Sequence, residues 1–202
     1  MTYISTKDMS RADWLKARKM GIGGSDSWRI VLDPEEYKYA GCLELFKEKT
    51  SGEIDESDSL PTRIGRELEG FVADLYTEAT GIAVHKWNRI IISDAHPFMT
   101  ANIDRKLLGR NEGLECKTIG EFAARKYVGT DEDGKKVYID RFVEGDMEAS
   151  LQNKLEWYIQ MQHYMAVTGW QMWHLAVLIG NHDFLWFDVP RDDPWIAEMV
   201  KQ

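Results

Sequence analysis

DRKLLGRNEGLECK, residues 104–117, is the most informative segment of this chain. It ends in Glu115-Cys116-Lys117. Because alternate side chains of a strand point to the same face, a strand here places the Glu115 carboxylate beside the Lys117 ammonium, with Cys116 facing away. The glycines and the asparagine within residues 105–114 let the chain fold back, so that Asp104 can lie beside Glu115.

Two carboxylates and a lysine in one place suit a magnesium site with a water nucleophile. Mg²⁺ prefers oxygen ligands and often takes only one or two carboxylates, together with phosphate and water. The lysine can hold or polarise the attacking water, or steady the pentavalent phosphorus. The same Glu-x-Lys spacing also suits a solvated cross-strand ion pair, so the tripeptide alone leaves both interpretations open.

With 44% apolar and 11% aromatic residues, the composition indicates a globular protein. The length predicts one domain over residues 1–202. The chain shows neither an apolar run of about 18 residues nor an apolar signal core, which predicts a cytoplasmic protein without a membrane span. The two cysteines, Cys42 and Cys116, provide no disulfide framework, zinc site or iron–sulfur cluster. A net charge of −9 argues against a protein that coats nucleic acid non-specifically. It is compatible with a nuclease that binds DNA through a local basic groove.

Caps and hydrophobic spacing predict helices in the first 80 residues. They cover residues 11–20 after an N-cap at Ser10, a short helix to Leu32 capped by Ser25 or Asp26, residues 41–49, and residues 63–80 closed by Gly81. Residues 51–60 are acidic and Ser-rich, and we expect a mobile loop there.

Strand-like segments dominate the rest of the chain. We expect strands at 82–93, 98–104, 113–118, 171–179 and 184–189, the last two forming a hairpin. Residues 129–140 suggest an exposed excursion, residues 151–168 the longest helical stretch of the chain, and Asp193-Pro194 the start of a last helix. This order predicts an α/β (α+β) fold with a central mixed sheet flanked by helices.

Several motifs follow one another along the chain. They are Trp14-Leu-Lys-Ala-Arg18 with Gly21-Ile-Gly-Gly-Ser25, then Gly65-Arg-Glu-Leu-Glu69, Asn102-Ile-Asp104, Glu115-Cys-Lys117, and Trp157-Tyr-Ile-Gln160-Met-Gln162-His-Tyr164. In this order and with these gaps they resemble the phage-type alkaline exonucleases of the YqaJ and lambda-exonuclease kind, within the PD-(D/E)xK nuclease superfamily. The resemblance implies a restriction-endonuclease-like core. Ile103 stands where the family has a proline.

The resemblance also implies the roles of the acidic residues and the lysine. Asp104 and Glu115, with the backbone carbonyl of Cys116, would hold Mg²⁺, for which Mn²⁺ can substitute, and Lys117 would orient the attacking water. Glu69 would make an outer or water-mediated metal contact. Glu67 is chemically equal to Glu69, and only the spacing from Gly65 favours the latter.

Polar residues of the predicted helix 151–168 complete the expected catalytic set. Gln160 and Tyr164 are four residues apart and share a helix face, which from the residues alone also suits a half-buried polar patch. The resemblance implies that Gln160 orients the lysine, the water or a DNA phosphate. Further candidates for this wall of the site are Asn102, Tyr164, Gln162 and Trp157.

Arg18 and Ser25 are the residues that the resemblance assigns to a terminal 5′-phosphate. A guanidinium fork suits phosphate oxygens, and a hydroxyl beside helix-start amides makes a phosphate cradle. From the residues alone, Arg18 equally suits a surface arginine and Ser25 a plain N-cap. The five histidines show no metal spacing, and we expect ordinary core or surface positions for them.

The function implied by the resemblance is a Mg²⁺-dependent 5′-to-3′ exonuclease on linear double-stranded DNA. It would expose a 3′ strand for a single-strand annealing protein in phage-type recombination. Relatives form rings around DNA, which implies a cyclic homo-oligomer, a trimer by resemblance, with Arg18, Lys117, Arg125 and Lys126 lining the channel. Two alternatives stay open: a related endonuclease or Cas4-like nuclease, and a non-catalytic module that binds DNA ends or a host protein.

Overall fold

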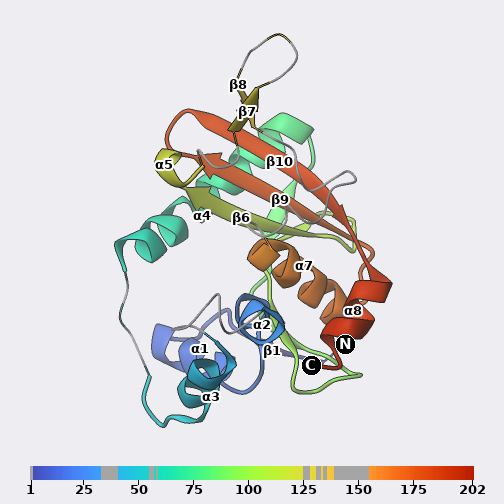
Figure 1. Cartoon of the computed structure of the whole chain (residues 1–202). Helices are drawn as coiled ribbons and strands as arrows, with labels where there is room; N and C mark the ends of the chain where they lie inside the picture. Colours follow the sequence, from blue (N-terminus) through green and yellow to red (C-terminus); the bar gives the residue numbers. More distant parts are fainter. Residues whose placement is uncertain are drawn as a thin grey trace.

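The computed structural model describes residues 2–32, 41–54, 57, 59–124, 128–130, 133, 136–138 and 155–202 (Figure 1). The helices are α1 (Arg11–Arg18), α2 (Gly24–Val31), α3 (Cys42–Thr50), α4 (Leu60–Thr80), α5 (Glu121–Ala124), α7 (Leu155–Thr168) and α8 (Asp193–Met199). The strands are β1 (Thr2–Ser5), β2 (Val84–Lys86), β3 (Arg89–Ile92), β4 (Thr100–Asn102), β5 (Arg105–Leu107), β6 (Gly113–Ile119), β7 (Val128–Thr130), β8 (Lys136–Tyr138), β9 (Met172–Ile179) and β10 (Asp183–Pro190).

A five-stranded mixed sheet in the order β10-β9-β6-β5-β2 forms the centre of the fold. β6 and β9 run parallel, and the remaining neighbours are antiparallel. The predicted hairpin over residues 171–189 is confirmed as β9 and β10. Helix α7 lies on one face of this sheet and α4 on the other, as Figure 1 shows, so the predicted mixed sheet flanked by helices is confirmed.

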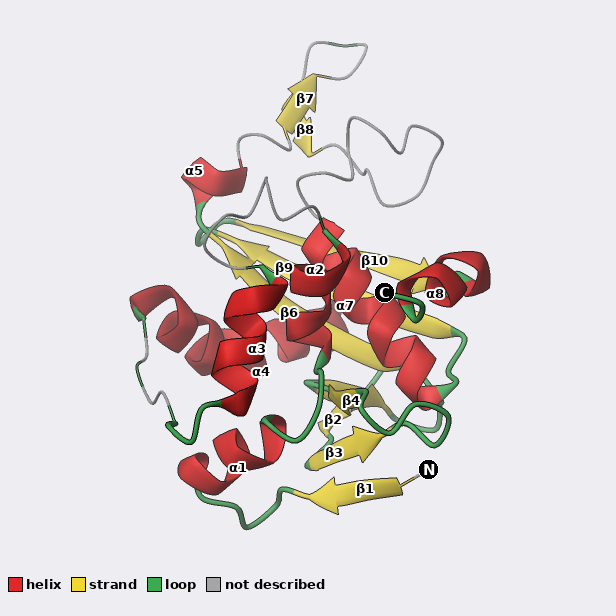
Figure 2. Ribbon diagram, turned by 60° about the horizontal axis from the view of Figure 1, so that its bottom comes forward, coloured by secondary structure: helices red, strands yellow, loops and turns green. Residues whose placement is uncertain are grey.

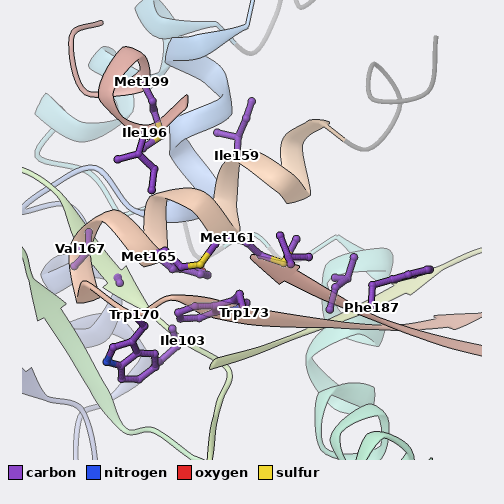
Figure 3. Packing of buried hydrophobic residues seen from close by; sticks show 14 of the residues in the cluster. Ile103, Ile159, Met161, Met165, Val167, Trp170, Trp173, Phe187, Ile196 and Met199 are labelled. Carbon is purple, nitrogen blue, oxygen red and sulfur yellow. The ribbon is translucent and has the colours of Figure 1, made fainter. Parts of the chain in front are cut away.

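Strand β9 divides the core into two halves because its side chains alternate between the faces. Leu175, Val177 and Ile179 join the larger core under α7, where Met161, Met165 and Trp173 also pack (Figure 3). The smaller core lies under α4, where Ala176 and Leu178 meet Val72, Tyr76, Leu107 and Leu114. A strand with both faces buried explains why residues 172–179 read as a continuous apolar run.

A second, three-stranded sheet of order β1-β3-β4 lies beside α1, as Figure 2 shows. It corrects one expectation, because residues 82–93 form two strands and not one. β2 pairs with β5 in the large sheet, whereas β3 pairs with β1 and β4 in the small one. Asp104 lies between β4 and β5, where the chain passes from the small sheet to the large sheet.

The predicted helices are present, with shifted ends. Ser10 caps α1 through its side chain, which accepts a hydrogen bond from the Asp13 amide at 3.1 Å. The N-cap of α2 is Gly23, whose amide donates to the Asp26 carboxylate at 2.9 Å, so neither Ser25 nor Asp26 is the cap. Both residues instead lie in the first turn, where the dipole favours an acid.

Three other helix boundaries depend on local chemistry. α4 begins at Leu60, before the expected residue 63, because the Ser59 side chain accepts from Thr62 N and a proline occupies the first turn. It ends at Gly81, whose φ of 72° suits glycine. The predicted last helix is confirmed as α8, and Asp192 caps it.

Several expectations lie wholly or partly outside the described residues. They concern Arg125 and Lys126, half of the 129–140 excursion, the start of the 151–168 helix, and part of the 51–60 loop. No helix in the described part of the chain is long and apolar enough to cross a bilayer.

Candidate active site

A cleft of about 560 Å³ is lined by residues of α1, α2, α4 and α7 and of strands β4 and β6. It gathers residues from five parts of the chain that the sequence analysis had singled out separately. They are Arg18, Ser25, Glu69, Asn102, Asp104, Glu115, Cys116, Lys117, Gln160 and Tyr164. Glu67, Trp157 and Gln162 do not line it.

Asp104 is held against β6 by the backbone. Its Oδ2 accepts a hydrogen bond from the Cys116 amide at 2.9 Å, so the return of the chain predicted from residues 105–114 is present. Burial, and then the negative charges of Glu115 and Glu69, raise the pKa of Asp104 well above its ordinary value. A cationic ligand between these carboxylates would relieve that repulsion.

Glu115 and Lys117 point to the α7 side of β6, while Cys116 packs into the smaller core on the α4 side. This is the alternation expected of a strand. Lys117 Nζ lies 2.7 Å from Glu115 Oε1. Because only 2% of Glu115 is exposed, the pair is not the solvated surface ion pair that its spacing alone would also permit.

Lys117 remains an ammonium group in this setting. Burial lowers the pKa of Lys117, but the charges of Glu115 and Asp104 act the other way and leave the pKa above its ordinary value. A charged lysine donates hydrogen bonds and cannot accept a proton. The geometry therefore suits Lys117 to holding a water or a phosphate oxygen, and not to acting as a base.

Gln160 connects the lysine to the acid. Its Oε1 accepts from Lys117 Nζ at 2.9 Å, and its Nε2 donates to Glu115 Oε1 at 2.6 Å and to the Tyr164 hydroxyl at 2.8 Å. Tyr164 in turn donates to the Asn102 carbonyl at 3.1 Å. The amide thus fixes both charged groups of β6 from α7.

Gln162 is wrong as a member of this wall. It is fully buried, donates to the Pro190 carbonyl and accepts from the Asp192 amide, both at 2.9 Å. The reason is helix geometry, since residues two apart point in nearly opposite directions. Gln162 instead ties α7 to the junction of β10 and α8.

Glu69, and not the exposed Glu67, faces the cleft from α4. Arg105 Nη1 makes an ion pair with Glu69 Oε1 and also donates to the Asp104 carbonyl at 2.7 Å. Sequence reasoning missed Arg105. Its position directly after the aspartate was the available signal, because the next residue along a strand edge stays near the site.

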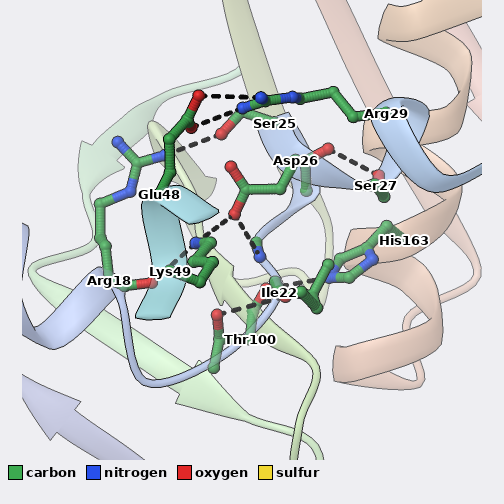
Figure 4. A network of polar contacts seen from close by, with 12 residues as sticks. Arg18, Ile22, Ser25, Asp26, Ser27, Arg29, Glu48, Lys49, Thr100 and His163 are labelled. Carbon is green, nitrogen blue, oxygen red and sulfur yellow. Dashed lines mark hydrogen bonds and ion pairs between the residues drawn. The ribbon is translucent and has the colours of Figure 1, made fainter. Parts of the chain in front are cut away.

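Arg18 and Ser25 form the other end of the cleft. Arg18 Nη2 donates to Ser25 Oγ at 2.7 Å (Figure 4). The guanidinium carbon of Arg18 lies 4.7 Å from the centre of the Trp14 ring. Trp14 Nε1 donates to Asn102 Oδ1 at 3.3 Å. These contacts hold a hydroxyl and a guanidinium side by side, an arrangement that suits phosphate oxygens.

Gly24 brings this end of the cleft against the catalytic candidates. A Cβ atom at Gly24 would lie 2.5 Å from Cε1 of the Tyr164 ring, so any side chain there would collide with it. The first turn of α2, which carries Ser25, therefore rests directly on the ring whose hydroxyl contacts Gln160.

The carboxylates fit a divalent cation that also takes non-protein ligands. Oε2 of Glu115 is buried and has no hydrogen-bond partner among the described residues, an expensive state for a carboxylate oxygen unless a cation satisfies it. Within the same residues no three His, Cys, Asp or Glu side chains form a complete metal cage. Two carboxylates, with phosphate and water as the remaining ligands, form a ligand set that Mg²⁺ often takes in proteins.

Known structures share this fold. An alkaline exonuclease from Laribacter hongkongensis superposes with a TM-score of 0.63 at 19% identity, covering 94% of this chain and 87% of the other. Its complex with dAMP gives 0.62 at 20% identity. A phage-related exonuclease from Haemophilus somnus gives 0.61 at 15% identity, covering 90% and 88% of the two chains.

Sequence comparison identifies the family. The protein YqaJ of Bacillus subtilis (strain 168) is 32% identical over 197 residues, which are 96% of this chain but 54% of YqaJ, so the chain spans about half the length of that relative. The profile of the YqaJ-like viral recombinase domain matches residues 13–171, a span that includes the ten cleft residues from Arg18 to Tyr164 named above. The chain therefore belongs to the family of YqaJ-like viral recombinase domains.

Proposed function

We propose that this chain is a Mg²⁺-dependent 5′-to-3′ exonuclease that acts on the ends of linear double-stranded DNA. One observation carries the proposal: the Asp104–Glu115–Lys117–Gln160 cluster and the Arg18–Ser25 pair line the same cleft. The first group suits phosphodiester hydrolysis and the second suits a terminal phosphate. Solved relatives of the same fold are named exonucleases, and one holds dAMP, which supports a nucleotide-sized product.

Asp104 and Glu115, with the backbone carbonyl of Cys116, would hold Mg²⁺, and Mn²⁺ would substitute for it. When bound, the cation supplies positive charge to the phosphate oxygens and to the leaving 3′-oxygen. The orphaned Oε2 of Glu115 supports this assignment. Glu69, already neutralised by Arg105, contributes through the second layer around the site.

The remaining side chains position the reactants. Lys117, kept charged, donates to the attacking water or to a phosphate oxygen, and Gln160 fixes the direction of its Nζ. Arg18 and Ser25 donate to the 5′-phosphate, whose double negative charge strengthens these hydrogen bonds relative to those of a 5′-hydroxyl. Holding both ends of the terminal nucleotide aligns its 3′-linkage for attack.

The wider role that we propose is the production of 3′ overhangs for a single-strand annealing protein in phage-type recombination. The viral recombinase description of the family supports it. We also propose that residues 1–202 act as one nuclease domain in the cytoplasm and assemble into a cyclic homo-oligomer, a trimer, around DNA. A related endonuclease, a Cas4-like nuclease, and a non-catalytic binder of DNA ends or a host protein are the alternatives.

One assay separates these functions. The protein is incubated with linear and with covalently closed circular duplex, the linear DNA carrying 5′-phosphate or 5′-hydroxyl ends, with Mg²⁺ or with EDTA. The proposal expects Mg²⁺-dependent loss of linear DNA only, faster from phosphorylated ends, with release of mononucleotides. Cleavage of both topologies would establish an endonuclease, and binding without cleavage would establish a non-catalytic module. Asp104→Asn serves as the control for contaminating nuclease.

A further inference from the structure

A second cavity, of about 460 Å³, adjoins the active-site cleft at the carboxylates. Both cavities are lined by Trp14, Glu69, Asn102 and Asp104. Asp104 therefore lies at the boundary between them, and a phosphate placed on it has open space on two sides. The side that contains Arg18 and Ser25 belongs to the cleft alone.

The outer wall of the second cavity is polar and basic. Lys86 is the last residue of β2, and Trp87 and Asn88 connect β2 to β3; the segment that joins β1 to α1 also lines this cavity. Lys86 is exposed, and neither it nor the Asn88 side chain has a hydrogen-bond or ion-pair partner among the described residues. Arg11 and Arg66, which line both cavities, add two more positive charges to the lining.

The ring of Trp87 is fixed in place. The guanidinium carbon of Arg89 lies 4.3 Å from the centre of the Trp87 ring and 4.1 Å from that of Tyr3, and Lys106 Nζ lies 5.5 Å from the centre of Trp87. Trp87 thus places a fixed, partly buried ring next to Lys86 and Asn88, whose side chains have no hydrogen-bond or ion-pair partner among the described residues. Together these groups match a nucleotide, which offers an apolar ring, polar ring edges and a phosphate.

We propose that this second cavity binds the nucleotide on the 3′ side of the scissile phosphate, with Lys86 contacting the phosphate that follows that nucleotide. The inference rests on the proposed exonuclease function. If the 5′-phosphate lies at Arg18 and the scissile phosphate lies at Asp104, the rest of the cleaved strand must leave the metal site on the other side. The cavity beyond Asp104 lies there, and its volume falls within the range of about 300–1,000 Å³ typical of small-ligand sites.

The test pairs one variant with one modified linkage. Lys86→Gln is compared with the wild type on a 5′-phosphorylated duplex whose linkage between nucleotides 2 and 3 is a neutral methylphosphonate. We expect the modification to slow the first cleavage by the wild type by about tenfold, as for loss of one charged hydrogen bond. On unmodified DNA, Lys86→Gln should be as slow as the wild type is on the modified duplex. The modification should not slow Lys86→Gln any further. Lys47→Gln, an exposed lysine of α3 that lines neither cavity, should behave as the wild type.

Binding provides a second measurement that does not depend on turnover. In EDTA, the slope of log Kd against log salt concentration should fall by about one for Lys86→Gln, because one phosphate contact is lost. A methylphosphonate penalty that persists unchanged in Lys86→Gln, together with an unchanged slope, would overturn the subsite. Failure of the exonuclease proposal would look different, since the wild type would then show neither selective loss of linear DNA nor a 5′-phosphate preference.

Discussion

Lys49 Nζ lies 2.5 Å from Asp26 Oδ2, and it also donates to the backbone carbonyl of Arg18 at 3.0 Å (Figure 4). Since Asp26 accepts from the Gly23 amide, one lysine of α3 joins the end of α1 to the first turn of α2. These are the two elements that carry Arg18 and Ser25. Among the described residues, Lys49 makes no hydrogen bond or ion pair with the side chain of Arg18 or Ser25, so under the proposed function it acts on the end pocket only by positioning them.

Lys49→Met should therefore weaken the preference for 5′-phosphorylated over 5′-hydroxyl ends by about tenfold, the effect of one misplaced charged hydrogen bond. Arg18→Ala and Ser25→Ala should lower the same ratio directly. The measurement is kcat/KM on matched duplexes that differ only at the 5′ end. Lys47→Met, on the same helix, is the control. An equal loss on both substrates would mean that Lys49 only supports the fold.

Lys117→Met should reduce the cleavage rate by several orders of magnitude while DNA binding falls less. The reason is that the ammonium acts on the water or on the transferring phosphate and not on the bulk of the duplex. Single-turnover rates and Kd, measured in parallel, separate the two effects. If affinity alone falls, Lys117 is a phosphate contact without a role in hydrolysis.

Two glutamines of α7 form a matched pair. Gln160→Leu should remove the link between Lys117 and Glu115 and so lower the rate by about 10²-fold or more, with modest loss of stability. Gln162→Leu should leave the rate nearly unchanged and lower the free energy of unfolding by about 1–3 kcal/mol. The reason is that it leaves the Pro190 carbonyl and the Asp192 amide without their hydrogen-bond partner. Denaturant unfolding and kcat per folded molecule test both. A rate defect specific to Gln162→Leu would restore that residue to the site.

Mg²⁺ should raise the unfolding temperature of the wild type and leave that of Asp104→Asn and Glu115→Gln unchanged. A ligand that binds only the folded state stabilises it by mass action, and these carboxylates are the proposed ligands. Both variants should also lose Mg²⁺-dependent cleavage. Differential scanning fluorimetry with Mg²⁺, Mn²⁺ and EDTA checks the binding without DNA. Near-normal turnover in either variant would remove that residue from the metal site.

His163 makes the fold sensitive to acid. It is fully buried, and because its Nε2 contacts the Thr100 carbonyl, which can only accept, this nitrogen carries the proton of the neutral ring. Burial lowers the pKa of His163 to about 4, from an ordinary value of 6.5. Between these values the unfolded chain takes up a proton that the folded chain does not. Stability should thus fall as the pH drops from 6.5 to 4, by up to about 3 kcal/mol.

His163→Gln should flatten this part of the pH profile, since an amide can still donate to Thr100 but does not titrate. Urea unfolding at intervals between pH 4 and pH 7 provides the measurement. The wild type and the variant are compared by the slope of their profiles, so a general loss of stability in the variant does not affect the result. Parallel profiles would show that other groups cause the acid sensitivity.

The parts of the site that could be predicted are those set by local periodicity. The alternation of Glu115, Cys116 and Lys117 on β6 follows from strand geometry alone, and the i, i+4 spacing of Gln160 and Tyr164 follows from the helix. The same reasoning, applied strictly, would have excluded Gln162. Spacing from Gly65 chose Glu69 over Glu67, and the cleft contains Glu69.

The parts that could not be predicted depend on partners distant in the chain. Residues 82–93 are strand-like at both ends, but β2 pairs with β5 whereas β3 pairs with β1 and β4, so the two strands join different sheets. The residues between the two ends do not specify which sheet each strand joins, because strand pairing depends on the surrounding structure. Likewise, the contact between Lys49 and Asp26 joins two helices whose separation in space no sequence pattern specifies.

The contact of Gly24 with Tyr164 has a consequence for the size of the product. The turn that bears Ser25 rests on the ring whose hydroxyl reaches Gln160, so the interval between the end pocket and the carboxylates is set by close packing and not by a movable loop. Under the proposed function this interval sets the distance between the terminal phosphate and the linkage that is cleaved. A strand seated by its terminal phosphate presents the same linkage for attack every time, and a side chain at position 24 would alter the length of the released piece.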